Sequence, residues 1–199
     1  TIQPYSPKAG TAISSHELNQ PGTYQDVTDT TVTAQFKLIK DNLPDFLHSE
    51  DDVFVLAWTT TPWTLPSNTA LTVGPNINYS LIKSFNQYTG LKADYILADE
   101  LISKQFSGNY FEVNDLVEVK NYEFDAKSIP YFKKSTFKGK DLENIKYEQL
   151  LDYATPFSDP ENAFRIIIGD FVTTSDGTGI VHTAPTFGAV CTCLLYTSD

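Results

Sequence analysis

A hydroxyl-rich stretch, AWTTTPWTLPSNTAL from Ala57 to Leu71, follows directly on an apolar run. Its threonine triplet, Thr59–Thr61, comes just before Pro62 and Pro66, which lack backbone donors, so a strand cannot simply continue. A hydroxyl both donates and accepts hydrogen bonds, which suits a site that holds an ester or a ribose without a charged partner. Trp63 offers a large, rigid apolar wall. Threonine is also common in strands and tryptophan in cores, so the pattern alone leaves an ordinary structural role open.

Metal and covalent chemistry are not indicated. The two cysteines, Cys191 and Cys193, are too close together to join distant parts of the chain, and they make an incomplete metal site. The three histidines, His16, His48 and His182, are far apart in the sequence and form no helical pair of ligands. The G-x-S-x-G motif of serine hydrolases is absent. We therefore expect no metal and no cofactor.

Length and composition are typical of one globular domain. The 199 residues are 41% hydrophobic, which is enough for one substantial core. No apolar run approaches the ~18–20 residues of a membrane span, and the first residues lack the charged start and apolar middle of a signal peptide. We expect a soluble protein without membrane contact. Because the sequence contains no methionine, we also expect a piece of a longer chain.

The charge distribution argues against general binding of nucleic acid. The formal net charge is -11, whereas nonspecific affinity for nucleic acid comes mainly from lysine and arginine. The stretch Lys127–Lys146 is the exception, because it holds six of the 14 basic residues. A solvated basic surface explains this stretch, and a local patch that contacts phosphates remains the alternative.

Short apolar alternations predict strands more often than helices. Strands are expected at residues 31–38, 53–58, 69–73, 78–82, 110–113, 116–119, 163–168 and 179–184. Residues 93–106 predict a strand that passes into a short helix, and Asp176-Gly177 predicts a turn between the last two strands. Since strands and helices do not alternate regularly, we predict a strand-rich α/β fold: a mixed, mainly antiparallel or barrel-like sheet with a few short peripheral helices.

Two motifs resemble those of the editing domain of isoleucyl-tRNA synthetase. The first is TTTPWTLPSNTAL, and the second is GTGIVHTAPTFGA, from Gly177 to Ala189. The order Thr61-Pro62-Trp63 favours the isoleucyl enzyme, because the valyl and leucyl enzymes carry Thr-Arg-Pro-type variants. The N-terminal region resembles the start of the same insertion, so the resemblance covers about Ser6 to Ala189. The signatures that form the aminoacyl adenylate, His-Ile-Gly-His and Lys-Met-Ser-Lys-Ser, do not occur.

The first 30 residues are rich in Ser, Thr, Gly and Pro and lack periodicity, so we expect an extended lead-in at 1–30. An editing domain at 31–189 and an atypical tail at 190–199 would follow. In the family, a pair of aspartates follows the second motif, and the second aspartate binds the α-ammonium of the aminoacyl group. Val190 and Cys191 stand there in this chain. We therefore expect the anchor for the amino group to be missing.

The resemblance also implies an activity. It is post-transfer editing, the hydrolysis of valine wrongly esterified to the 3′ terminal adenosine of tRNA(Ile), carried out in the cytoplasm by one part of a full-length synthetase. Thr59, Thr60 and Thr61 would contact the aminoacyl-adenosine and the hydrolytic water. His182 would limit the space for the amino-acid side chain, although a histidine at the end of a strand is more commonly a hydrogen-bonded structural residue.

Four further residues would bind the substrate or shape its pocket. Trp63 would shape the pocket and Asn68 would support it. Gly177 and Gly179 would allow a turn and a close approach of the backbone.

Two other functions stay open at this point. The chain could bind aminoacyl-adenosine without useful turnover, or it could be a protein-interaction module that shares only the fold. Deacylation of mischarged valyl-tRNA would separate editing from both. Binding of a nonhydrolysable valyl-adenosine analogue would separate the two alternatives from each other.

Overall fold

The computed structural model describes residues 3–24, 26, 28, 30–41, 43–153, 155–156 and 160–185. The chain divides into two compact units, residues 1–30 and residues 31–199. The predicted tail, with Val190 and Cys191, lies outside the described residues, as does the end of the second motif from residue 186. Among the described residues, no helix is long and apolar enough to cross a membrane.

The first unit is a small folded element. Strands β1 (Tyr5–Ser6) and β2 (Thr11–Ala12) pair antiparallel, and a single helical turn, α1 (Ser15–Leu18), follows. Ser14 and Glu17 form a capping box, in which the Ser14 backbone N–H donates to the Glu17 carboxylate at 2.7 Å. We expected an extended lead-in here, and the local S-x-x-E pattern explains why part of it is helical instead.

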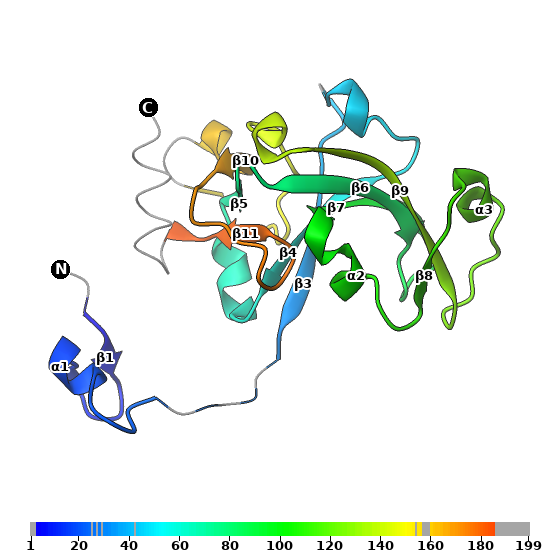
Figure 1. The fold of residues 1–199 in the computed structure, drawn as a ribbon. Helices are drawn as coiled ribbons and strands as arrows, with labels where there is room; N and C mark the ends of the chain where they lie inside the picture. The colour runs from blue at the N-terminus through cyan, green and yellow to red at the C-terminus, as the bar shows by residue number, and fades with distance from the viewer. Residues whose placement is uncertain are drawn as a thin grey trace. The chain divides into compact units, whose positions relative to one another are not determined.

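The main sheet of the second unit has six strands in the order β3-β4-β7-β6-β9-β8. All neighbours in this sheet pair antiparallel except β4 with β7 and β8 with β9, which are parallel. Figure 1 shows the long strands β6 and β9 running side by side through this unit. In chain order the strands are β3 Val32–Lys37, β4 Val53–Thr59, β6 Asn78–Phe85, β7 Lys92–Ala98, β8 Tyr110–Glu112 and β9 Ile129–Lys138.

A smaller sheet has β5 (Ala70–Val73) at its centre. Strand β10 (Arg165–Ile168) pairs with it in parallel and β11 (Ile180–Thr183) pairs with it antiparallel. The expected turn at Asp176-Gly177 is present, but the two strands that it joins lie on opposite sides of β5 and do not pair with each other. The strand-rich mixed α/β fold is confirmed, and the described residues of the second unit form two open sheets in place of a closed barrel.

The helices of the second unit are short. The predicted change from strand to helix is confirmed, because β7 leads through the 3₁₀ turn η3 (Asp99–Leu101) into α2 (Ile102–Gln105). The prediction of a strand at 116–119 was wrong, because residues Leu116–Lys120 form helix α3. The Asp115 side chain accepts a hydrogen bond from the Val117 N–H at 2.9 Å, which caps this helix. The remaining 3₁₀ turns are η1 Asp45–Leu47, η2 Pro62–Ser67, η4 Gly139–Leu142 and η5 Pro160–Asn162.

The core lies on both faces of the main sheet, as the alternation along β4 shows. Val53, Val55 and Ala57 belong to one hydrophobic cluster, which also takes in residues of β5, β10 and β11. Phe54 and Leu56 belong to or pack against a second cluster. Successive side chains of a strand point to opposite faces, so β4 joins the two clusters and carries the threonine triplet at its end.

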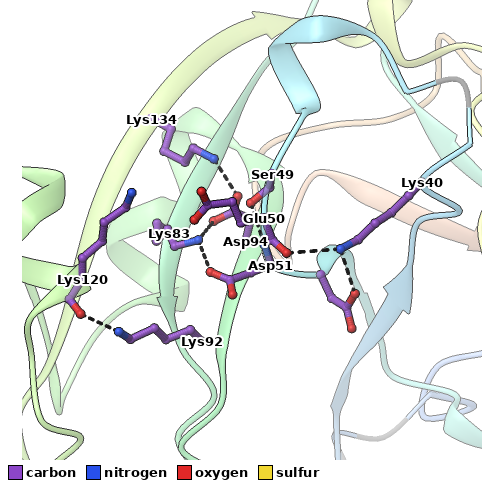
Figure 2. Close-up of polar contacts among 10 residues, drawn as sticks. Lys40, Ser49, Glu50, Asp51, Lys83, Lys92, Asp94, Lys120 and Lys134 are labelled. Carbon is purple, nitrogen blue, oxygen red and sulfur yellow. Dashed lines mark hydrogen bonds and ion pairs between the residues drawn. The ribbon is translucent and has the colours of Figure 1, made fainter.

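A group of charged side chains is buried within the main sheet. Lys83 and Asp94 lie opposite each other on β6 and β7, and both are almost completely buried. Figure 2 shows Lys83 between the carboxylates of Asp94 and Asp51, with Lys134 reaching Asp94 from β9. The Lys134 ammonium lies 2.7 Å from Asp94, and the Lys83 ammonium lies 3.3 Å from it. Because Lys133 also pairs with Asp99 at 2.5 Å, two lysines of the basic 127–146 stretch already have carboxylate partners.

Candidate active site

A pocket of about 570 Å³ lies where β4 ends, between η2, β11 and the loop that leads into β11. It brings together the two motifs identified in the sequence. The first motif contributes Thr59–Thr61, Trp63 and Thr64, and the second contributes Gly177–His182. Among the described residues that line it, Asp176 is the one with a charged side chain, and it is exposed and 3.4 Å from Lys104. The rest of the described lining offers hydroxyls, backbone groups, apolar and aromatic side chains and one imidazole.

The threonine triplet is organised by its own hydrogen bonds. Thr59 is buried, and its hydroxyl oxygen accepts the backbone N–H of Thr61 at 3.1 Å. Pro62 then begins η2, in whose first turn a backbone N–H would have no partner within the helix, so the missing donor of proline is tolerated there. The strand therefore ends before Pro62. Thr60 and Thr61 are exposed residues of the pocket lining, and the Thr61 hydroxyl lies 3.3 Å from that of Thr59 and 3.4 Å from that of Thr64.

His182 is held in one protonation state by its neighbours. The Thr64 hydroxyl donates to the carbonyl oxygen of Thr61 at 2.7 Å, and a hydroxyl has only one proton to donate. It must therefore accept from Nε2 of His182, which is also 2.7 Å away. On the other side of the ring, Nδ1 lies 3.5 Å from the Asn68 amide nitrogen, which can only donate. The imidazole is thus neutral, and its proton is on Nε2.

Asn68 connects this imidazole to the core. Its side-chain nitrogen donates to the carbonyl oxygen of Ala70 at 2.9 Å, and its side-chain oxygen accepts from the Tyr147 hydroxyl at 2.6 Å. Burial raises the pKa of Tyr147 well above its usual value, so this hydroxyl keeps its proton and donates. The chain of contacts from Tyr147 through Asn68 to His182 has a consistent direction of donation at every step.

The pKa of His182 is lowered from its ordinary value of 6.5 because burial disfavours the charged ring. Below about pH 6.5 the unfolded chain therefore binds a proton that the folded chain does not bind, so the free energy of unfolding should fall as pH decreases. His182→Gln should remove this part of the pH dependence. Urea denaturation between pH 5 and pH 7.5 measures it. His48→Gln, which alters an exposed histidine of the same unit, should keep the slope of the original chain.

Gly177 and Gly179 of the second motif have backbone conformations that favour glycine. Gly177 has φ +75°, and a Cβ there would lie 2.9 Å from the Trp58 ring. Gly179 has φ +70°, and a Cβ there would lie 2.4 Å from the Cβ of Ala98. Positive φ and a close approach of this kind both favour glycine.

The structure brings every predicted site residue to this pocket except Asn68, which lies behind His182. Trp63 lines the pocket but is 62% exposed, so it lies at the rim. Sequence reasoning missed Thr64, although it lies inside the first motif, and Tyr147, for which the sequence holds no local signal. Among the described residues, no group of three or more potential ligands could hold a metal ion.

The fold is that of aminoacyl-tRNA synthetase editing domains. The editing domain of the cytosolic leucyl-tRNA synthetase of P. knowlesi superposes with a TM-score of 0.57 at 13% identity, covering 82% of this chain and 61% of that one. The sequence places the chain in the isoleucine–tRNA ligase family, as the homologue of one segment of those enzymes.

Two relatives illustrate the match. The isoleucine–tRNA ligase of Cytophaga hutchinsonii is 57% identical over 189 residues, and that of Bacteroides fragilis is 52% identical over 189 residues. In each case 95% of this chain is covered, and the chain spans 16% of the length of the relative. No family model matches the chain.

Proposed function

We propose that this chain edits the product of an isoleucine–tRNA ligase by hydrolysing valine esterified to the 3′ terminal adenosine of tRNA(Ile). The observation that carries the proposal is the hydroxyl-lined pocket formed by both motifs in a chain homologous to those ligases, with its one charged lining residue among those described, Asp176, at an exposed position. We further propose that the rest of the synthetase supplies the synthetic site and delivers the tRNA end, and that the reaction takes place in the cytoplasm.

The reaction needs no covalent intermediate. A water oxygen attacks the ester carbonyl carbon, the bond from that carbon to the ribose oxygen breaks, and the ribose oxygen takes up a proton. Thr60 and Thr61 are exposed residues of the pocket, and their hydroxyls are suited to donate hydrogen bonds to the oxygen that gains negative charge. Thr59 holds the Thr61 backbone in place. An ester is already activated, so a well-placed water accounts for much of the rate.

His182 acts in this proposal as part of the pocket wall. Both of its ring nitrogens have partners, and its proton is on Nε2, so no ring lone pair is free to take a proton from water. A wall that excludes larger side chains is needed because isoleucine and valine differ by one methylene. In an apolar binding pocket that methylene changes the binding free energy by only about 1–3 kcal/mol, and isoleucyl-tRNA synthetases are the usual illustration of this limit. A second site that excludes the larger isoleucyl ester overcomes this limit. Trp63, Asn68, Gly177 and Gly179 would shape that site.

The binding-only alternative rests on one observation. Asp176, the charged residue that lines the described pocket, lies at an exposed position beside Lys104, so the pocket holds no buried general base among the described residues. The two proposals differ in turnover. Mixing the chain with mischarged valyl-tRNA(Ile) should release valine if the editing proposal holds. Binding of a nonhydrolysable valyl-adenosine analogue without release of valine would favour the alternative.

The proposed exclusion of isoleucyl esters by His182 can be tested directly. His182→Ala should admit isoleucyl esters, because the space of the ring becomes available to the additional methylene, and cleavage of isoleucyl-tRNA(Ile) should rise roughly tenfold or more. The measurement is release of amino acid from both charged tRNAs. Tyr147→Phe is the matched control, because it removes a partner of Asn68 without enlarging the pocket. A His182→Ala chain that cleaves valyl esters normally and still rejects isoleucyl esters would contradict the role.

A further inference from the structure

A second pocket of about 570 Å³ lies on the main sheet and has no place in the function proposed above. Strands β3 and β4, the turn between β6 and β7, and helix α2 contribute to it. Its described lining contains no charged side chain. It is instead rich in aromatic rings and in side-chain amides, among them Tyr88, Tyr95, Phe106, Gln35, Asn86 and Gln105.

This pocket adjoins the first one. Leu56 lines the second pocket and Trp58 lines the first, and the two residues point to the same face of β4 because they are two positions apart. Two residues of strand span roughly 6.6 Å. Gln105 lines the second pocket and donates from its side-chain nitrogen to the carbonyl oxygen of Gly177 at 2.9 Å. Gly177 lines the first pocket, so this hydrogen bond joins a residue of one pocket to a residue of the other.

The aromatic rim of the second pocket is held in position by Asn86. The Asn86 side-chain oxygen accepts the backbone N–H groups of Tyr88 at 2.9 Å and Thr89 at 3.1 Å, and its nitrogen donates to the Gln35 side-chain oxygen at 3.3 Å. The turn between β6 and β7 is thereby fixed, and it presents Tyr88 at 87% exposure. An exposed aromatic ring on a fixed turn is suited to stacking against another flat ring.

The interior combines aromatic rings, which are tilted relative to each other, with polar groups. The rings of Tyr95 and Phe106 lie 6.0 Å apart between centroids. The Tyr95 hydroxyl is buried and has no hydrogen-bond partner among the described residues. An uncharged, planar ligand with donors and acceptors at its edge matches this lining, whereas a phosphate would find no cation among the described lining residues.

We infer that the second pocket binds the base of the nucleotide that precedes the terminal adenosine of the tRNA acceptor end. The inference rests on the proposed function, because that function places the terminal adenosine in the first pocket. Tyr88 stacks on the base, while the amides of Gln35 and Gln105 face its polar edge. The backbone phosphates stay outside, which fits an acidic chain that binds the end of a tRNA and not its whole surface.

The experiment compares two nonhydrolysable probes by calorimetry. One is valyl-adenosine with an amide in place of the ester, and the other is the same compound with cytidine linked to its 5′ side. The dinucleotide probe should bind roughly tenfold more tightly, and Tyr88→Ala should remove that gain. Tyr88→Phe should keep it, because the ring still stacks. Tyr153→Ala, which alters an exposed tyrosine outside the pocket, should change neither affinity.

The outcomes separate this inference from the proposed function. If the mononucleoside probe binds and the added cytidine brings no gain, the second pocket does not hold a base, and the editing proposal stands. Cytidylyl-adenosine without an amino acid gives an independent reading by NMR. It should shift the backbone signals of Tyr88 and Gln105, and it should do so even if the chain hydrolyses no ester. Unchanged signals at both residues would overturn the inference.

Discussion

Thr60→Arg should abolish editing and leave the fold intact. Thr60 is exposed and lines the pocket, so a long side chain can be placed there without entering the core. It would occupy the space in which the ester and its water must meet. Since a misplacement of about 1 Å can reduce a rate by about a hundredfold, we expect the rate of valyl-tRNA(Ile) deacylation to fall by at least that factor. The midpoint of urea denaturation should be unchanged.

Two controls separate blocking from other effects. Thr60→Ser keeps a hydroxyl without bulk and should retain most of the activity. Thr155→Arg adds the same charge and the same side chain at an exposed threonine outside the pocket, so it should leave deacylation unchanged. If Thr60→Arg still deacylates valyl-tRNA(Ile) at the original rate, the reaction takes place elsewhere on the chain.

Asp94→Asn should produce a large loss of stability. Asp94 is completely buried, and its carboxylate faces the ammonium groups of Lys83 and Lys134. Removing its charge leaves the buried Lys83 with Asp51 alone. Breaking a buried ion pair costs about 3–5 kcal/mol, mainly because the remaining charge stays in a medium that solvates it poorly. Chemical denaturation should show a decrease of that size in the free energy of unfolding.

Asp52→Asn is the matched control for this loss. Asp52 also has two lysine partners, Lys37 at 3.1 Å and Lys40 at 3.4 Å, but its side chain is 41% exposed. Exposed ion pairs contribute about 0–1 kcal/mol, so the loss should stay below about 1 kcal/mol. A similar loss for both variants would show that burial does not set the cost.

A triple variant also tests whether the loss comes from a buried charge that is left without its partner. Lys83→Met, Asp94→Leu and Lys134→Met together remove the three charges that meet at the buried Asp94 and keep similar side-chain volumes, while the partly exposed carboxylate of Asp51 remains. Since apolar replacements of a whole buried ionic group are often neutral or stabilising, most of the stability lost in Asp94→Asn should return. If the triple variant is less stable than Asp94→Asn, the charged group contributes something that apolar packing cannot replace.

The ion pairs of Lys133 and Lys134 also change how the basic stretch 127–146 is interpreted. In the sequence it is a local excess of positive charge in an acidic chain. In the structure, Lys133 and Lys134 are paired with Asp99 and Asp94. Reversing their charges would therefore break internal ion pairs, and any effect on tRNA binding would be mixed with a loss of stability.

The sequence by itself determined the local features of this protein. The alternation in residues 31–38 fixed β3, and the prolines after the threonine triplet fixed the end of β4. The two motifs carried the resemblance to an editing domain, and the glycines of the second motif indicated the turn. These features depend on neighbours within a few residues, where side-chain chemistry and backbone preference act directly. The prediction at 116–119 failed for a local reason as well, because the Asp115 cap was overlooked.

Only the tertiary structure decided which distant residues meet. Strands β10 and β11 flank β5, and all four residues of β5 are buried. A fully buried strand shows no alternation in the sequence, so its central place could not be predicted. Lys83 and Asp94 belong to strands whose two faces are both covered, so charged positions that would ordinarily be solvent-exposed became buried. His182 meets Thr64 across 118 residues, and Asn68 meets Tyr147 across 79. The hydrogen bonds that fix the protonation state of His182 exist only once the sheets have packed, because burial removes the water that would otherwise compete for those groups.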